Sequence, residues 1–325
     1  MKLGILGGGA WGTALAQVAA SGGEDVILWA HESAVVASIN ASHRNPQFLP
    51  EVALNPRIVA TANPDDLMAC DAILAVTPAQ HLRATLARMP LGQRALILCC
   101  KGIEAETMLL MSEVARETCP DAAIAVLSGP TFAGEVARGQ PTAITLAADD
   151  SSLARQLAKR LARPHFRPYV STDVIGAEIG GAVKNVLAIG CGIVEGFGLG
   201  QNARAALIAR GFAEMTRYGI ARGAQAETLA GLSGLGDLVL TCSSTASRNF
   251  TLGKGLGEGK RAADLLANRL TVAEGAFTAP VLDKSAKALG VDMPVVATVC
   301  ALLAEELPVG EAIAQLLARP LRHEV

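Results

Sequence analysis

The first half of the chain alternates short, continuously apolar runs with longer segments in which apolar and polar residues are mixed. Continuous apolar runs are typical of parallel strands that are covered on both faces, whereas the mixed segments favour helices. The apolar runs predict strands over Lys2–Leu6, Asp25–Trp29, Ile58–Ala60, Asp71–Val76, Ala95–Cys100, Ala123–Leu127 and Thr142–Ala148. The mixed segments predict helices over Trp11–Ala20, Glu32–Asn40, His81–Arg88 and Thr107–Glu117. This alternation indicates an α/β fold with a doubly wound parallel sheet.

The pattern changes beyond about Thr172, where strand-like runs disappear and helix-length segments take over. These segments predict helices over Val174–Val194, Ala203–Ala221, Ala226–Leu229, Phe250–Gly257, Val272–Leu289, Pro294–Glu306 and Glu311–Ala318. We therefore expect two domains, with residues 1–173 forming the α/β domain and residues 174–325 forming an all-helical domain.

Three glycines follow the first predicted strand in Gly-x-Gly-x-x-Gly spacing. Gly7 allows a sharp turn, Gly9 lets the backbone approach phosphates, and Gly12 lets strand and helix pack closely. The bare N-terminus of the following helix can then hold a pyrophosphate. Because strand, turn and helix occur in the required order, the motif predicts a Rossmann-type, dinucleotide-binding domain. A turn without a ligand is the alternative, whereas a signal peptide is excluded because glycines would interrupt its apolar region.

Composition and charge narrow the class of protein. With 325 residues, 51% of them hydrophobic and 18% charged, the chain can bury a core in each of two domains. A net charge of -2 argues against a general nucleic-acid binder. Outside the glycine-rich opening we find no uncharged apolar stretch long enough for membrane insertion. Seven cysteines without Cys-x-x-Cys spacing fit reduced thiols, so we expect a soluble cytoplasmic protein.

The five histidines are scattered along the chain. None has an acidic partner at a sequence spacing suited to a hydrogen bond between the side chains, which argues against the His–Asp relay of lactate- or malate-type dehydrogenases. They also form no cluster with cysteine, so we expect no metal site.

Residues that could bind a ligand or take part in a reaction follow the carboxyl ends of the predicted strands. These residues are Gly7 to Gly9, His31, Thr77-Pro78, Lys101-Gly102 and Ser128-Gly129-Pro130-Thr131. In a doubly wound sheet these ends face one crevice, where ligands bind. Residues far apart in sequence are therefore expected to meet at one site.

The predicted helix Val174–Val194 carries one lysine in a stripe of small residues. The stripe has four-residue spacing and comprises Gly176, Gly180, Lys184, Ala188 and Gly192. One interpretation is a helix crossing from which the lysine extends into solvent. The other is a lysine in a poorly solvated cleft, where desolvation would lower its pKa toward that of a general base. Asn185 beside it could orient a carbonyl group or the nicotinamide.

Two later segments could assist the lysine. Asp237 stands in a nearly uncharged run, where it could cap a helix or accept a hydrogen bond from Lys184 or a substrate hydroxyl. Ser247-Arg248-Asn249 leads into a predicted helix, and hydroxyls, an arginine and a helix N-terminus together suit a phosphate group. A plain capping sequence with a solvated arginine is the alternative.

Several sequence blocks resemble a known family along almost the whole chain. The most specific are Ser128-Gly129-Pro130-Thr131-Phe132-Ala133, Gly181-Ala182-Val183-Lys184-Asn185 and Gly234-Leu235-Gly236-Asp237-Leu238. They are accompanied by Phe48-Leu49-Pro50, Lys101-Gly102, Gly200-Gln201-Asn202-Ala203-Arg204, Ser247-Arg248-Asn249 and Val272-Ala273-Glu274-Gly275. In this order they resemble the bacterial NAD(P)-dependent glycerol-3-phosphate dehydrogenase family.

The resemblance implies interconversion of sn-glycerol 3-phosphate and glycerone phosphate, a small phosphorylated three-carbon substrate, to supply phospholipid synthesis. It implies that Lys184 is the proton acceptor, and we expect Asp237 to orient it. The implied substrate-binding residues are Lys101, Gly129, Thr131, Lys184, Asp237, Ser247, Arg248 and Asn249. The implied dinucleotide-binding residues, beside Gly7, Gly9 and Gly12, are Ala10, Trp11, His31, Lys101, Ala133, Arg248, Val272 and Glu274.

Two positions bear on the cofactor. Ala10 stands where family members usually have Ser, which leaves backbone N–H groups to bind the pyrophosphate. His31, followed by Glu32, stands where an NAD-selective site usually has a carboxylate. A histidine repels a 2′-phosphate less than a carboxylate does, so we expect the protein to accept NADP(H). Binding of NAD(H) is not excluded.

Two other functions stay open from the sequence. One is a related lysine-base dehydrogenase for a hydroxy acid, which would need residues that grip a carboxylate. The other is a dinucleotide-sensing regulator without turnover, which leaves the lysine in the small-residue stripe unexplained. The sequence does not fix the oligomeric state, and a homodimer is one option.

Overall fold

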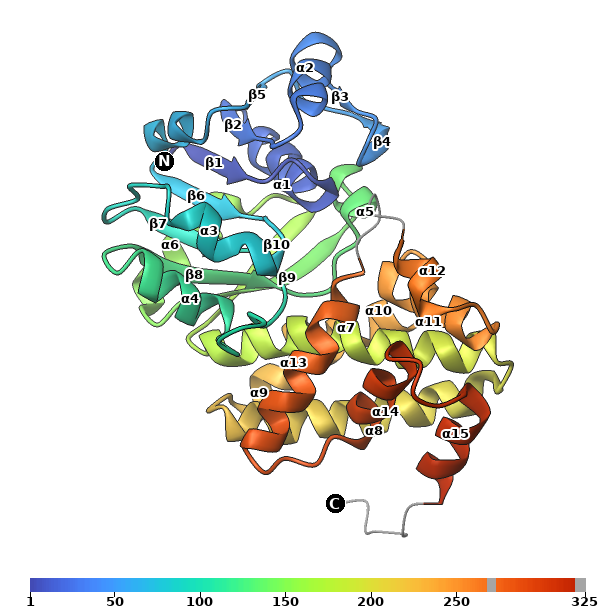
Figure 1. The fold of residues 1–325 in the computed structure, drawn as a ribbon. Coiled ribbons are helices and arrows are strands. Elements are labelled where there is room, and N and C mark those ends of the chain that lie inside the picture. The colour runs from blue at the N-terminus through green and yellow to red at the C-terminus, as the bar shows by residue number, and fades with distance from the viewer. Residues whose placement is uncertain (268–272, 319–325) are drawn as a thin grey trace. The chain divides into compact units, whose positions relative to one another are not determined.

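The computed structural model describes residues 1–267 and 273–318, and its first part is built on a twisted sheet (Figure 1). Within the described residues the sheet has eight strands in the order β10-β9-β8-β7-β6-β1-β2-β5. The strands are β1 (Leu3–Leu6), β2 (Val26–Trp29), β5 (Ile58–Thr61), β6 (Ala72–Ala75), β7 (Ala95–Leu98), β8 (Ala123–Ser128), β9 (Thr142–Ala147) and β10 (Phe166–Ser171). The strand order reverses at β1, between β2 and β6. This reversal creates the switch point beside which ligands bind in such sheets.

Each predicted strand occurs, with ends within two residues of the prediction, but the sheet is not parallel throughout. The pairs from β5 to β8 are parallel, whereas β9 pairs with β8 in antiparallel fashion. The expectation of a parallel strand at Thr142–Ala148 was therefore wrong in direction. The connection contains only α5 (Ala133–Ala137), which is about 8 Å long and cannot return along a strand of about 20 Å. The chain therefore enters β9 at the edge where β8 ends.

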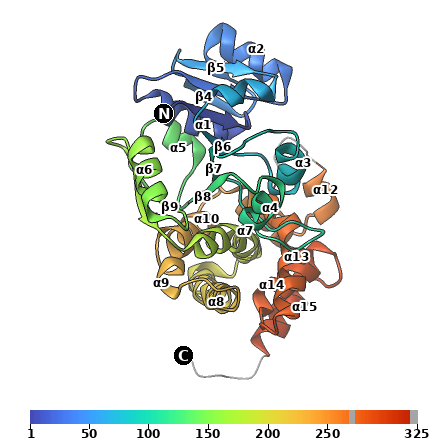
Figure 2. The ribbon, with the colours of Figure 1, turned by 90° about the vertical axis from the view of Figure 1, so that its left-hand side faces the viewer.

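Helices cover both faces of the sheet, as the doubly wound prediction requires. Side chains of α1 (Ala10–Ala20) and α6 (Ser151–Leu161) pack with one face, in a core that includes Leu74 of β6. Side chains of α3 (Leu82–Leu86) and α4 (Met111–Thr118) pack with the other, in a core that includes Ile73 and Ala75. Figure 2 shows α6 on one side of the sheet and α3 and α4 on the other.

Short elements that the sequence analysis did not predict complete this part of the chain. They are the hairpin β3 (Arg44–Asn45) and β4 (Leu49–Ala53), helices α5 and α6, the edge strand β10, and the 3-10 turns η1 (Pro64–Ala69) and η2 (Ala79–His81). Helix α2 spans Ser33–Ser42. The predicted helix His81–Arg88 is thus shared between η2 and the short α3.

The rest of the described chain is helical, as predicted. Its longer helices are α7 (Val174–Gly196), α8 (Gly200–Ala221), α11 (Arg248–Gly257), α13 (Glu274–Ala288), α14 (Pro294–Leu303) and α15 (Val309–Leu317). Its shorter ones are α9 (Ala226–Leu229), α10 (Asp237–Cys242) and α12 (Ala262–Leu266), with a π-turn, η3, over Leu232–Gly236. Val272, the predicted start of one helix, lies outside the described residues.

The chain divides into two compact units. The sheet unit joins residues 1–181 to residues 224–237, and the helical unit joins residues 182–223 to the described residues from 238 onward. Helices α7 and α10 each continue from one unit into the other. The division into domains at residues 173 and 174 stays a prediction. In the structure the chain crosses between the units three times, at residues 181/182, 223/224 and 237/238.

Helix α7 is long and apolar enough to cross a membrane by length and composition, but 94% of its most apolar window is buried inside the protein. Its burial is that of a core helix. The glycines of its stripe permit close packing within each unit, because a Cβ at Gly180 would overlap the backbone of Ser233 and one at Gly192 would overlap that of Phe250.

Candidate active site

The glycine turn between β1 and α1 has the geometry of a phosphate-binding turn. Gly7 has a φ of 131°, and a Cβ there would lie 3.0 Å from the backbone of Val76. A Cβ at Gly12 would overlap the carbonyl oxygen of Gly7. At Gly9, by contrast, a Cβ would meet no atom within 4 Å. Gly7 and Gly12 are therefore required by packing within the protein, and Gly9 leaves space for a ligand.

The N-terminus of α1 is open to an anion. Its N-cap is Gly9, no side chain caps it, and its first turn holds no acidic residue. The indole Nε1 of Trp11 is buried and has no hydrogen-bond partner within the part of the chain that the structure describes. Free backbone N–H groups, the positive end of the helix dipole and an unused indole donor fit the pyrophosphate side of a dinucleotide.

Lys101 follows β7 and is held inside the sheet unit. Its Nζ lies 2.7 Å from Oδ2 of Asp237 and donates to the carbonyl oxygen of Gly129 at 3.3 Å. The side chain of Lys101 is 15% exposed and that of Asp237 is fully buried. A Cβ at Gly181 would lie 3.2 Å from Cγ of Lys101, so the missing side chain in α7 makes room for this lysine. The sequence analysis did not foresee the Lys101–Asp237 pair.

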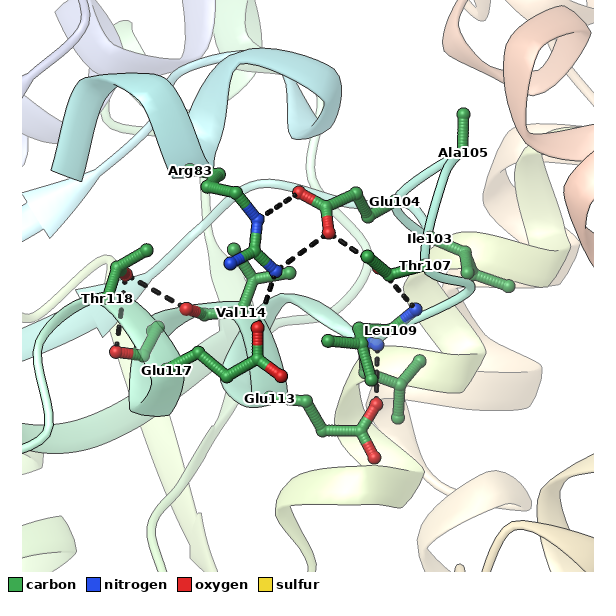
Figure 3. A network of polar contacts seen from close by, with 12 residues as sticks. Arg83, Ile103, Glu104, Ala105, Thr107, Leu109, Glu113, Val114, Glu117 and Thr118 are labelled. Atoms are coloured by element: carbon green, nitrogen blue, oxygen red, sulfur yellow. Dashed lines mark hydrogen bonds and ion pairs between the residues drawn. The ribbon is translucent and has the colours of Figure 1, made fainter. Parts of the chain in front are cut away.

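The loop that follows Lys101 is braced by the polar network of Figure 3. Arg83 donates to both carboxylate oxygens of Glu104 at 2.9 Å and to Glu117 at 2.7 Å. Thr107 donates to Glu104 as well. These hydrogen bonds from Arg83 lower the pKa of Glu104, so the carboxylate stays ionised near neutral pH. The brace ties the loop after β7 to the helix that follows β6.

Lys184 lies in the part of α7 that belongs to the helical unit. Its side chain does not extend into solvent, because the residue is only 5% exposed. Its Nζ donates to the hydroxyl oxygen of Thr241 at 2.9 Å. Thr241 and Asp237 stand four residues apart in α10 and therefore on the same face of that helix.

Asn185, which follows Lys184 in α7, is held by a residue at the start of α11 in the helical unit. Asn249 donates from Nδ2 to Oδ1 of Asn185 at 3.0 Å and accepts the N–H of Gly275 at 2.9 Å. Ser247 is the N-cap of α11 and accepts the N–H of Phe250 at 3.3 Å. The hydroxyl of Ser247 therefore caps a helix, which the sequence analysis considered as the alternative to a phosphate-binding role.

The remaining candidate residues lie in both units. Thr131 donates to the carbonyl oxygen of Gly129 at 3.3 Å, and Ala10 and Ala133 begin α1 and α5. His31 is exposed just beyond β2. In the helical unit, Arg248 begins α11 with an exposed side chain, and Glu274 begins α13. Val272 lies outside the described residues. The roles of all these residues in binding stay predictions.

Two buried glutamates lie apart from these residues. Burial raises the pKa of Glu178 to about 7, although Ser112 donates to it from both its N–H and its hydroxyl. Burial likewise raises the pKa of Glu214 to about 7, against the effect of hydrogen bonds from the N–H groups of Val295 and Val296. Each carboxylate caps the N-terminus of another helix by accepting its backbone N–H groups. This structural role accounts for both buried glutamates. Among residues 1–267 and 273–318, no group of three His, Cys, Asp or Glu could hold a metal ion.

The doubly wound sheet, the glycine turn at its switch point and the buried Lys184 are features typical of the NAD(P)-dependent dehydrogenase class. Comparisons with known proteins identify the family. Residues 2–154 match the family model described as NAD-dependent glycerol-3-phosphate dehydrogenase N-terminus, and residues 173–314 match that of the C-terminus. The chain belongs to the NAD-dependent glycerol-3-phosphate dehydrogenase family.

Relatives match over nearly the full length of the chain. It is 63% identical over 323 residues to glycerol-3-phosphate dehydrogenase [NAD(P)+] of Erythrobacter litoralis, covering 99% of this chain and 98% of that protein. It is 62% identical over 323 residues, with the same coverage, to glycerol-3-phosphate dehydrogenase [NAD(P)+] 1 of Sphingopyxis alaskensis. Its fold is similar to the crystal structure of glycerol-3-phosphate dehydrogenase from Coxiella burnetii, with a TM-score of 0.93 at 37% identity, covering 98% of this chain and 99% of that one.

Proposed function

We propose that the protein interconverts sn-glycerol 3-phosphate and glycerone phosphate, with Lys184 as the proton-transferring residue and NADP(H) or NAD(H) as cofactor. The observation that carries the assignment of Lys184 is its buried amine, held on Thr241 at 2.9 Å. The names of the full-length relatives support the substrate pair.

The proton chemistry follows from the properties of a buried amine. The bound nicotinamide supplies the hydride acceptor in oxidation and the hydride donor in reduction. During oxidation, the neutral amine of Lys184 takes the proton of the C2 hydroxyl as the C2–H bond breaks. During reduction, its ammonium form polarises the carbonyl and returns that proton to the oxygen. Oxidation requires the neutral amine, because only that form can accept the proton.

The other polar residues would position the substrate. Arg248 and the N-terminus of α11 supply charge and N–H donors that suit the phosphate group. Lys101, held on Asp237, offers a second ammonium to the substrate oxygens. Asn249 connects Asn185 to the backbone of Gly275 and so fixes the amide that stands next to Lys184 in the chain. Binding the distant phosphate helps hold C2 at reacting distance.

The cofactor would bind at the glycine turn, with its pyrophosphate on the N-terminus of α1. The open space at Gly9 and the unused indole donor of Trp11 support this placement. His31, which carries no fixed negative charge, would tolerate a 2′-phosphate. We expect activity with NADPH and NADH, in a soluble cytoplasmic enzyme that supplies glycerol 3-phosphate for phospholipid synthesis.

A spectrophotometric assay tests the proposed reaction. Loss of reduced cofactor is followed after addition of glycerone phosphate, with NADPH and NADH in separate reactions. We expect oxidation of the cofactor with glycerone phosphate and little with 2- or 3-oxo acids. Preferential turnover of an oxo acid would instead support a hydroxy acid dehydrogenase. Cofactor binding without turnover of any of these compounds would support a regulator.

A further inference from the structure

A buried asparagine outside the motifs discussed so far contacts the glycine turn. Asn45 lies in the hairpin β3–β4 and is fully buried. Its Nδ2 donates to the carbonyl oxygen of Gly8 and to the hydroxyl oxygen of Thr13, each at 2.9 Å. Its Oδ1 accepts the N–H of Phe48 at 3.3 Å, which closes the hairpin. The side chain thus connects the hairpin to the turn through both of its polar atoms.

Thr13 acts on the same carbonyl group. It lies in the first turn of α1, is fully buried, and donates from Oγ1 to the oxygen of Gly8 at 3.2 Å. The carbonyl of Gly8 therefore accepts hydrogen bonds from two buried side chains. Because both donors are rigidly placed in the protein interior, they fix the direction in which this carbonyl points.

The direction of the Gly8 carbonyl determines that of the next N–H group. In a planar trans peptide, the C=O of Gly8 and the N–H of Gly9 point in opposite directions. The carbonyl points toward Asn45 and Thr13, so the N–H of Gly9 points away from them. The surroundings of Gly9 are open, since a Cβ there would meet no atom within 4 Å. Glycine on both sides would let this peptide rotate readily if it were not held.

We propose that Asn45 and Thr13 are positioning residues for the dinucleotide, because they hold the Gly8–Gly9 peptide with the N–H of Gly9 toward the pyrophosphate. Without them the peptide can turn its carbonyl oxygen to the phosphate, which replaces an attraction by a repulsion. This inference rests on the proposed dinucleotide site and extends it to a hairpin outside the glycine motif. It also gives a role to the block Phe48-Leu49-Pro50, which forms the turn and second strand that support Asn45.

Direct ligand binding to the full chain tests the proposal. Titration calorimetry without substrate measures the affinity for NADPH and for ADP-ribose, which has the pyrophosphate but no nicotinamide. We expect weakening of both ligands by about tenfold in N45A and about fivefold in T13V, as the loss of one or two hydrogen bonds predicts. Thr13→Ser keeps the hydroxyl, so the affinity of this variant for both ligands should stay near the wild-type value. In turnover assays, the KM for NADPH should rise while that for glycerone phosphate stays unchanged.

Asn55→Ala is the matched control, because Asn55 bonds to the other end of α1. Its Nδ2 donates to the carbonyl oxygen of Ala20 at 3.3 Å, and its Oδ1 accepts the N–H of Arg57 at 2.9 Å. We expect N55A to lower the thermal midpoint and leave both affinities unchanged. Wild-type affinity in T13V and N45A would overturn the proposal. If N45A does not fold, equal affinities of T13V and T13S overturn it. Failure of the wild type to bind either ligand would overturn the dinucleotide site itself, and with it this inference.

Discussion

Nζ of Lys101 lies 2.7 Å from Oδ2 of Asp237, although the two residues are 136 positions apart in the chain. Asp237 is fully buried, whereas Lys101 keeps 15% of its side chain exposed. The pair therefore brings the loop after β7 and the start of α10 together at one point of the sheet unit.

This difference in burial predicts that removing Lys101 and removing Asp237 lower the free energy of unfolding by different amounts. Lys101→Met removes the ammonium that pairs with a fully buried carboxylate, whereas Asp237→Asn removes the partner of an ammonium that still reaches water. We expect K101M to lower the free energy of unfolding by roughly 3 kcal/mol and D237N to lower it by less. Urea denaturation of the two variants at neutral pH measures both values. A larger loss in D237N would contradict the assignment of the desolvation cost to the carboxylate.

Arg248 should act mainly on the substrate. Arg248→Ala removes a guanidinium that would bind the phosphate group, and a charge-assisted hydrogen bond of this kind changes affinity by about 10- to 100-fold. We expect the KM for glycerone phosphate to rise by such a factor. The control is Arg261→Ala, which removes an arginine of the same unit that pairs with Glu305. An unchanged KM in R248A would remove Arg248 from the phosphate site.

The raised pKa of Glu214 predicts a pH-dependent contribution to stability. Its folded pKa of about 7 lies above the ordinary value of 4.5, so between these values the folded state binds more protons than the unfolded state. The contribution of Glu214 to the free energy of unfolding is therefore fully present below pH 4.5 and is lost as the pH rises through 7. Glu214→Gln cannot ionise and does not show this loss.

Unfolding free energies at pH 5 and pH 8 measure the effect. The free energy of unfolding of E214Q, taken relative to that of the wild type, should be higher at pH 8 than at pH 5 by on the order of 2–3 kcal/mol. Glu178 is present in both proteins, so its own titration cancels in the comparison. A difference that is independent of pH would show that Glu214 titrates at the same pH in the folded and unfolded chains.

Local patterns predicted the fold well where burial is continuous. Strands such as Ala95–Cys100 were recognised because every residue is apolar, and only their ends shifted. The edge strand β10 was missed because Arg167, Pro168 and Tyr169 make it read as a polar loop. The direction of β9 depends on the length of the connecting helix, which the apolar pattern alone does not reveal.

The sequence singles out candidate residues for the site, but it does not reveal which of them pair with one another. Lys101, Lys184 and Asp237 stand out as isolated charges among apolar or small residues, so the sequence singles them out. Their partners depend on tertiary structure: Asp237 accepts from Lys101, and Thr241, which was not considered, accepts from Lys184. The orientation of Lys184 by Asp237 stays a prediction. Asn45 carried no sequence signal because its partners are a backbone carbonyl of the glycine turn and the hydroxyl of Thr13 in α1.

The role of Lys184 as proton acceptor can be tested with one pair of variants. Lys184→Met keeps the length and packing of the side chain but removes its amine, and Lys184→Ala removes both. Lys254→Ala is the control, because it removes an exposed lysine of the same unit that pairs with Glu258.

Turnover of glycerone phosphate and direct binding of NADPH, both measured on K184M, test the central claim most directly. Loss of a general acid–base group predicts that kcat falls by about 10²–10⁴-fold or more. Affinity for NADPH should stay at the wild-type value, and K254A should retain full activity. Near-normal turnover in K184M would contradict the account, since the proton would then be transferred by another group.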